Sequence, residues 1–258
     1  MASTLIAFDF DGVICDGLIE YFQTAWRAYC LLFKPSTIVP PAGLAERFYP
    51  LRPVIETGWE MPLLLRALLL GKTDAEIIAA WPSLAVELID AAAIPQAEAA
   101  QAVDGERDRW IKADLESWLA QHRFYPHMLK ILQRSLEQQP TYIVSTKEGR
   151  FIRQLLHQQG ITIPANQVLG KEVKRPKYET LRQLIQEHGT DGVSPGVWFI
   201  EDRIKALQAV KQQPDLGGVE LFLADWGYNL EPERQQAEQD DRISLLSLDA
   251  VVQKFKAA

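Results

Sequence analysis

The chain has 258 residues, of which 47% are hydrophobic and 24% are charged. This length is enough for one large domain or two modest ones. Its 27 basic and 34 acidic residues give a formal net charge of −7, and an acidic surface of this kind does not attract nucleic acid or anionic membranes non-specifically. A small anionic ligand stays compatible with this charge, because a local positive site inside an acidic protein is common.

The cysteine content and the apolar stretches limit which classes of protein the chain can belong to. Cys15 and Cys30 are too few for a disulfide framework and match no zinc spacing, so we expect two reduced thiols. The N-terminus carries no basic leader and no apolar segment of signal length. The most apolar stretch, 61–70, is too short to span a bilayer and contains Arg66. We therefore expect a cytoplasmic protein without a membrane partner.

Four short runs of the chain are apolar, with Glu220 as the one charged residue within them, and end in polar or turn residues. Their β-branched and aromatic content, without strict alternation, is typical of strands buried on both faces of a parallel sheet. The runs are 5–8, 142–144, 197–200 and 219–224, with 168–169 as a shorter fifth.

Helical periodicity fills the gaps between most of these runs. Apolar residues recur on one helical face over 128–136, 151–156, 181–185 and 204–210. Strand and helix alternating in this way predict right-handed crossovers. The expected fold is therefore α/β, with a doubly wound, Rossmann-like parallel sheet.

The segment between about Asp16 and Phe124 has a different pattern. It shows no strand alternation, and its helical patterns, such as that of 110–119, are interrupted repeatedly by proline. We therefore predict a helical domain at 16–124, inserted into a sheet domain formed by 1–15 and 125–258.

Polar side chains follow three of the predicted strands. In an open parallel sheet, ligands bind beyond the carboxyl ends of the strands, so these residues are expected to meet at one edge. They are Asp9 and Asp11 with Gly12 after the first strand, Ser145, Thr146 and Lys147 after the second, and Glu201 and Asp202 after the third, with a basic loop at 171–177 between the last two.

This set of residues predicts a metal-assisted phosphoryl-transfer site. Carboxylates crowded at one edge repel each other unless a cation lies among them, and Mg²⁺ prefers such hard oxygen ligands. A hydroxyl and a lysine beside the metal would hold the remaining phosphate oxygens. The set therefore contains a nucleophile, a metal site, a positive clamp and a proton carrier.

The segment 8–13 resembles the first motif of the haloacid dehalogenase-like superfamily, which contains paired aspartates. Ser145 matches the Ser/Thr of the second motif, Lys177 or Lys174 the lysine of the third, and Glu201-Asp202 the acidic fourth motif. All four occur in the family's order at the predicted strand ends, over residues 1 to about 14 and about 125 to 230. The helical insertion falls where this family carries a cap.

The resemblance implies a magnesium-dependent phosphatase. Asp9 would attack phosphorus to form an aspartyl-phosphate, and Asp11 would act as general acid and then general base. Ser145 and the lysine would hold the phosphoryl group, with Thr146 as the alternative to Ser145. The magnesium ligands would be the Asp9 carboxylate, the backbone carbonyl of Asp11, and Asp202, with Glu201 as the alternative. Family members that cleave carbon–halogen bonds lack an aspartate at the position of Asp11, so phosphoryl chemistry is favoured.

Two choices stay open in these motifs. The family's lysine commonly precedes a proline directly, whereas Arg175 separates Lys174 from Pro176; we favour Lys177, which opens the next helix, and keep Lys174 as the alternative. In the insertion, Arg52 and Glu56 are candidates for reading the polar groups of a substrate. A surface salt bridge between them is the alternative interpretation.

The substrate expected from the resemblance is a small phosphorylated metabolite, and no nucleic acid partner is expected. Residues 50–103, 199–203 and 223–229 show a general likeness to a plant and cyanobacterial subgroup of these phosphatases. Two other functions are compatible with the motifs: a sugar phosphomutase or other phosphotransferase of the same fold, and a catalytically silent binding or regulatory protein. The sequence makes no prediction of oligomeric state.

Overall fold

A computed structural model describes residues 4–189 and 195–257 of the chain. Residues 1–3, on which the expectation of no basic leader partly falls, lie outside the described residues. The chain divides into two compact units, one formed by residues 1–16 and 123–258 and the other by residues 17–122. The first is a sheet unit and the second is a helical unit.

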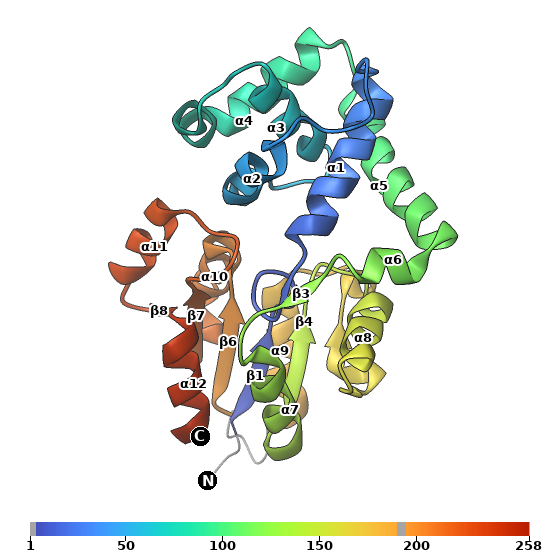
Figure 1. Ribbon diagram of the computed structural model, residues 1–258. Coiled ribbons are helices and arrows are strands. Elements are labelled where there is room, and N and C mark those ends of the chain that lie inside the picture. The colour runs from blue at the N-terminus through green and yellow to red at the C-terminus, as the bar shows by residue number, and fades with distance from the viewer. Residues whose placement is uncertain (1–3, 190–194, 258) are drawn as a thin grey trace. The chain divides into compact units, whose positions relative to one another are not determined.

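A parallel sheet forms the centre of the sheet unit (Figure 1). Its order is β5-β4-β1-β6-β7-β8, and every neighbouring pair is parallel. This confirms the predicted α/β class with a doubly wound parallel sheet. The strands are β1 (Leu5–Phe8), β4 (Thr141–Val144), β5 (Val168–Leu169), β6 (Val197–Glu201), β7 (Val219–Ala224) and β8 (Ile243–Leu246).

Strand β1 lies in the middle of the sheet because all four of its residues are apolar and fully buried. From β1 the chain winds through β4 to β5 and then returns to β6, which pairs with the other side of β1. The winding direction therefore reverses at β1, and a crevice at the strand ends is expected there.

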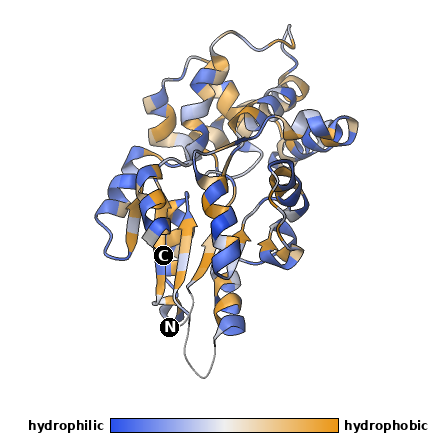
Figure 2. Cartoon of the chain, turned by 60° about the horizontal axis from the view of Figure 1, so that its bottom comes forward, coloured by the Kyte–Doolittle hydropathy of each residue, from blue (hydrophilic) through white to orange (hydrophobic). Residues whose placement is uncertain are grey.

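The two faces of the sheet are covered by different helices. Leu5 and Ala7 belong to a core that includes buried residues of α9 (Lys177–His188) and α10 (Ile204–Lys211). On the opposite face, Phe8 stacks on Phe255 with ring centroids 5.7 Å apart. Figure 2 shows the strands between these layers as mostly hydrophobic, as expected for a sheet buried on both sides.

Further short elements complete the sheet unit. Strands β2 (Cys15–Asp16) and β3 (Arg123–Phe124) pair antiparallel with each other. The remaining helices are α7 (Met128–Gln138), α8 (Gly149–Gln158), α11 (Glu231–Glu238) and α12 (Leu248–Ala257), with 3₁₀ turns η2 (Ala165–Gln167), η3 (Lys171–Val173) and η4 (Pro214–Leu216).

A buried carboxylate ties the helical unit together. Glu20, which is 1% exposed, accepts hydrogen bonds from Arg107 Nε (2.8 Å) and Trp118 Nε1 (3.1 Å), and these contacts join α1 to α5 and α6. Such a buried charge requires these partners. The elements are α1 (Leu18–Phe33), α2 (Leu44–Phe48), η1 (Tyr49–Val54), α3 (Glu60–Leu69), α4 (Asp74–Ala91), α5 (Gln96–Ala113) and α6 (Leu115–Leu119).

A proline disturbs the regular geometry of one helix in this unit. Pro82 lies inside α4, and the backbone of Ala80 departs from helical geometry two residues earlier, so α4 is kinked there. Among the described residues, no single helix has the length and apolar character to cross a bilayer. Helices α4 and α5, bent by 95° to each other, meet that test only as a pair and only by length and composition.

Candidate active site

Three buried carboxylates meet at the ends of β1 and β6. Asp9 directly follows β1, and its N–H donates to the carbonyl of Ile200 at 2.8 Å, which continues the pairing of the two strands. Asp9, Glu201 and Asp202 each present a carboxylate oxygen within 4.8 Å of the others. Their residues are 6%, 0% and 1% exposed. The predicted acidic cluster therefore lies at the point where the winding of the sheet reverses.

Lys177 lies among these carboxylates. Its Nζ is 3.0 Å from Asp9 Oδ2 and 2.6 Å from Glu201 Oε2. The other oxygen of Glu201 accepts hydrogen bonds from the backbone amides of Asp202 (3.1 Å) and Arg203 (3.0 Å). Both oxygens of Glu201 thus have partners within the protein, and its strongest contact orients Lys177.

Asp9 keeps an oxygen atom available for a ligand, and Asp202 is held in place close to it. Asp9 Oδ1 is buried and has no hydrogen-bond partner within the described part of the chain. Asp202 Oδ2 accepts from the backbone amide of Tyr228 at 2.6 Å, and the Asp202 carbonyl accepts from Asn229 Nδ2 at 3.0 Å. The loop after β7 therefore holds Asp202 in place. Asn229 was not predicted as a site residue, although its position after a predicted strand was a usable signal.

Gly12 makes the close approach of Asp202 sterically feasible. Its φ is +86°, a backbone conformation that favours glycine. A Cβ placed on Gly12 would overlap the carboxylate of Asp202. The glycine of the Asp-x-Asp-Gly sequence is therefore required both for its conformation and for the room that it leaves.

The buried cluster shifts the pKa values of its members. Burial, and then the charge of Glu201, raise the pKa of Asp9 to about 7, while Lys177 acts in the opposite direction. Burial and the neighbouring carboxylates of Glu201 and Asp9 likewise raise the pKa of Asp202. Burial alone would lower the pKa of Lys177, but Asp9 and Glu201 outweigh it, so the pKa of this ammonium is raised. Burial and the mutual repulsion of these carboxylates therefore outweigh the one lysine in their effect on the pKa values of Asp9 and Asp202.

The residues of this cluster fit a magnesium ion. The donor set consists of carboxylate oxygens, which hard divalent cations prefer. The unpartnered Asp9 Oδ1 is a buried polar atom that needs a partner, and a cation would supply one. Asp9 and Asp202 are the residues that would hold the ion, because Glu201 is already engaged with Lys177 and two amides.

Asp11 has a different partner from the other acidic residues. Lys147 Nζ donates to both of its carboxylate oxygens, at 3.1 Å and 3.3 Å. Lys147 follows β4 as predicted, but no specific role was predicted for it. Its position beside two hydroxyl residues at a strand end was the only available signal.

The two hydroxyl candidates differ in burial. Ser145 is 6% exposed, and its Oγ accepts a hydrogen bond from the backbone amide of Lys147 at 3.3 Å. Thr146 is exposed. The backbone amide of Ser145 donates to the carbonyl of Leu169 at 3.0 Å, so its position is fixed between β4 and β5. Ser145 is therefore the more buried of the two, and its hydroxyl oxygen is held by a backbone amide.

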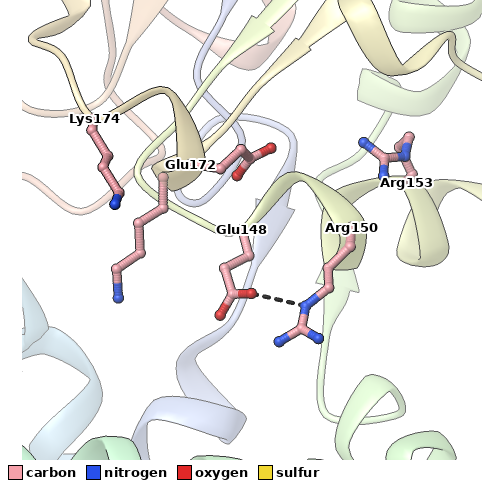
Figure 3. Close-up of a pocket in the computed structure, with 6 residues that line it drawn as sticks. Glu148, Arg150, Arg153, Glu172 and Lys174 are labelled. Carbon is pink, nitrogen blue, oxygen red and sulfur yellow. Dashed lines mark hydrogen bonds and ion pairs between the residues drawn. The ribbon is translucent and has the colours of Figure 1, made fainter.

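Lys174 lies in another part of the sheet unit from Lys177. It lines a pocket beside the N-terminus of α8, where Glu148 pairs with Arg150 at 2.8 Å (Figure 3). Lys174 adopts a left-handed conformation, with φ +50°, at the end of η3. The structure therefore brings Lys177, and not the alternative Lys174, to the side chain of Asp9.

Arg52 and Glu56 belong to the helical unit. Arg52 Nη1 donates to the carbonyl of Ile55 at 3.1 Å, and its guanidinium lies over the ring of Tyr21, 4.4 Å from the centroid. The backbone amide of Glu56 donates to Glu60 Oε2 at 2.7 Å. These contacts order the turn between η1 and α3, and a role of Arg52 or Glu56 in substrate binding stays a prediction.

Comparisons with known proteins identify the fold. Neither a protein-family model nor a curated protein matches the chain. Solved structures do match over nearly its whole length. A haloacid dehalogenase-like family hydrolase from Streptococcus pneumoniae aligns with a TM-score of 0.58 and 16% identity, covering 99% of each chain. A predicted phosphoglycolate phosphatase from Haemophilus somnus aligns with a TM-score of 0.57 and 17% identity, covering 98% of this chain and 96% of the other. A hydrolase from Pseudomonas syringae gives 0.55 and 12%, with coverage of 99% and 98%.

The chain therefore has the fold of the haloacid dehalogenase-like hydrolases. At these identities the match establishes the fold, and the chemistry must be argued from the residues of this chain.

Proposed function

We propose that this protein is a magnesium-dependent phosphatase that hydrolyses a small phosphorylated metabolite through an aspartyl-phosphate at Asp9. The observation that carries the proposal is the difference in contacts between the two oxygens of the Asp9 carboxylate. Its Oδ2 is fixed by Lys177 at 3.0 Å, while its Oδ1 is buried and has no hydrogen-bond partner among the described residues. An oriented oxygen of this kind, beside a lysine, is suited to nucleophilic attack on phosphorus.

The first half of the proposed reaction forms a covalent intermediate. An oxygen of Asp9 bonds to phosphorus while the bond from phosphorus to the ester oxygen breaks. The carboxyl group of Asp11 gives its proton to the leaving oxygen, so the product leaves as an alcohol. Lys177 and the Ser145 hydroxyl would bind the oxygens of the phosphoryl group and hold it in line with Asp9.

The second half returns the enzyme to its starting state. Asp11, now a carboxylate, takes a proton from a water molecule as that water attacks phosphorus. The bond between phosphorus and Asp9 breaks, and inorganic phosphate leaves. When bound, magnesium supplies positive charge that offsets the charge of the carboxylates and the phosphoryl oxygens.

The helical unit is proposed to act as the cap of this enzyme. Its insertion between Asp16 and Arg123 places it directly after the residues that carry the first motif. A cap would exclude water and contribute substrate contacts, with Arg52 and Glu56 as candidates. Membership of a plant and cyanobacterial subgroup, and the absence of nucleic acid and membrane partners, are further proposals consistent with this function.

The proposed function is tested by phosphate release from a panel of small phosphate esters, in magnesium and in EDTA. The wild-type protein is expected to release phosphate only with magnesium, and Asp9→Asn is expected to release none while remaining folded. Product analysis on a sugar phosphate distinguishes hydrolysis from transfer to a second position of the sugar. No turnover of any ester by the folded wild-type protein would contradict the proposal and favour a binding role.

A further inference from the structure

Lys147 reaches across the sheet edge to a residue that is 136 positions away in the sequence. Its Nζ lies 3.1 Å from Asp11 Oδ1 and 3.3 Å from Asp11 Oδ2, so it contacts both oxygens of the carboxylate. The side chains of Lys147 and Asp11 are only 11% and 14% exposed. An ion pair with so little exposure is weakly screened by solvent, so its geometry is better defined than that of a surface pair.

The backbone of Lys147 is fixed at both of its polar groups. Its N–H donates to Ser145 Oγ at 3.3 Å, and its carbonyl accepts from the backbone amide of Lys171 at 2.9 Å. Gly170 packs against the same carbonyl, and a Cβ on Gly170 would come within 2.5 Å of it. The ammonium of Lys147 is therefore carried by a short segment held between the ends of β4 and β5.

Lys147 and Lys177 contact different carboxylates of the same unit. Lys177 contacts Asp9 and Glu201, whereas Lys147 contacts Asp11. A lysine that binds the phosphoryl group would be expected to contact Asp9. The contact of Lys147 points instead to the proton-transfer step.

We propose that Lys147 is a positioning residue that holds the carboxyl group of Asp11 where it delivers its proton to the leaving oxygen. This inference rests on the proposed function, in which Asp11 protonates that oxygen. A carboxyl group on a flexible side chain loses much of its effect as a general acid when it is misplaced, and an error of about 1 Å costs on the order of a hundredfold in rate. The substrate class implied is an ester whose leaving group is an alcohol, which needs a proton to depart.

The test compares two leaving groups in the Lys147→Met variant. For an alkyl phosphate, whose alkoxide is a poor leaving group, kcat/KM is expected to fall by roughly ten- to a hundredfold. For 2,4-dinitrophenyl phosphate, whose phenolate leaves without a proton, kcat/KM is expected to change little. Because kcat/KM reports only the steps up to departure of the leaving group, the later attack of water does not affect it. Lys130→Met, at an exposed lysine of α7, controls for the loss of one positive charge.

Two further variants separate positioning from a structural role. Lys147→Arg is expected to recover part of the alkyl phosphate activity, because a guanidinium can also contact both carboxylate oxygens. In the Asp11→Asn background, Lys147→Met is expected to add almost no further loss, since its effect acts through Asp11. Thermal unfolding of each variant checks that it is folded.

Equal losses on both esters, or a full additional loss in the Asp11→Asn background, would overturn the role of Lys147. These outcomes are distinct from failure of the proposed function. That failure would appear as absent turnover in the wild-type protein or as turnover that survives in Asp9→Asn.

Discussion

Lys177 and Glu201 form the closest ion pair of the candidate site, with 2.6 Å between Nζ and Oε2. Glu201 is fully buried, and its second oxygen is held by the amides of Asp202 and Arg203. The pair therefore links the lysine proposed to bind phosphate to the strand end that carries a proposed magnesium ligand. Its geometry explains how one lysine is kept at a fixed distance from Asp9.

Replacing Glu201 by Gln should reduce both stability and turnover. The amide keeps an oxygen for the backbone contacts but removes the charge that faces Lys177, and we expect a loss of about 1–3 kcal/mol in the free energy of unfolding. Because Lys177 would then be less well oriented, kcat should fall by roughly tenfold or more. Denaturant unfolding and steady-state kinetics measure the two effects. Glu179→Gln, at an exposed residue of the same helix as Lys177, should change neither.

A substitution at Gly12 tests whether magnesium binding needs the space that this glycine leaves for Asp202, in addition to its backbone conformation. Gly12 and Gly71 both have positive φ, +86° and +82°, but a Cβ meets the Asp202 carboxylate only at Gly12, and at Gly71 it meets nothing within 4 Å. Both alanine variants should lose about 1 kcal/mol from the left-handed conformation. Only Gly12→Ala should also lose the stabilisation by magnesium. If the two variants respond to magnesium alike in thermal unfolding, the steric explanation is wrong.

The raised pKa of Asp9 predicts a pH dependence of stability in the metal-free protein. Burial and Glu201 raise this pKa from 3.8 to about 7, so the folded state holds a proton that the unfolded state has released. Between these values the folded state binds more protons, and stability should therefore decrease as the pH rises from about 4 to about 7. The raised pKa of Asp202 acts with the same sign. Thermal unfolding in EDTA across this range measures the effect.

Magnesium should reverse this trend. The ion competes with protons for the carboxylates, so the increase in Tm that it causes should be large at about pH 8 and small at about pH 5. Asp202→Asn should remove most of that increase, whereas Asp225→Asn, in the loop after β7, should retain it. An increase of equal size at both pH values would show that magnesium does not bind to these carboxylates.

Much of the sheet unit was predictable because its strands are buried on both faces. The runs at 5–8, 168–169 and 219–224 coincide with β1, β5 and β7, since continuous apolar residues have few other stable places. Strand β8 was not predicted, because the exposed Ser244 interrupts its short apolar run.

The site was less predictable than the fold because local sequence patterns do not specify contacts between distant residues. The order of the strands brings Asp9 beside Glu201 and Asp202, and this follows from the position of each residue at a strand end. The pairing of Lys147 with Asp11 does not follow from that rule. It depends on the direction of one side chain, which neither spacing nor periodicity specifies.

The most direct test of the account is to trap the intermediate on Asp9. The protein is mixed with magnesium and an ester that it turns over, quenched, and treated with borohydride, which reduces an aspartyl-phosphate to homoserine. Peptide mass spectrometry then locates the change. We predict homoserine at position 9, dependent on both magnesium and ester, and absent from Asp9→Asn. Rapid turnover with Asp9 unmodified, or with the modification at another residue, would contradict the central claim that Asp9 is the nucleophile.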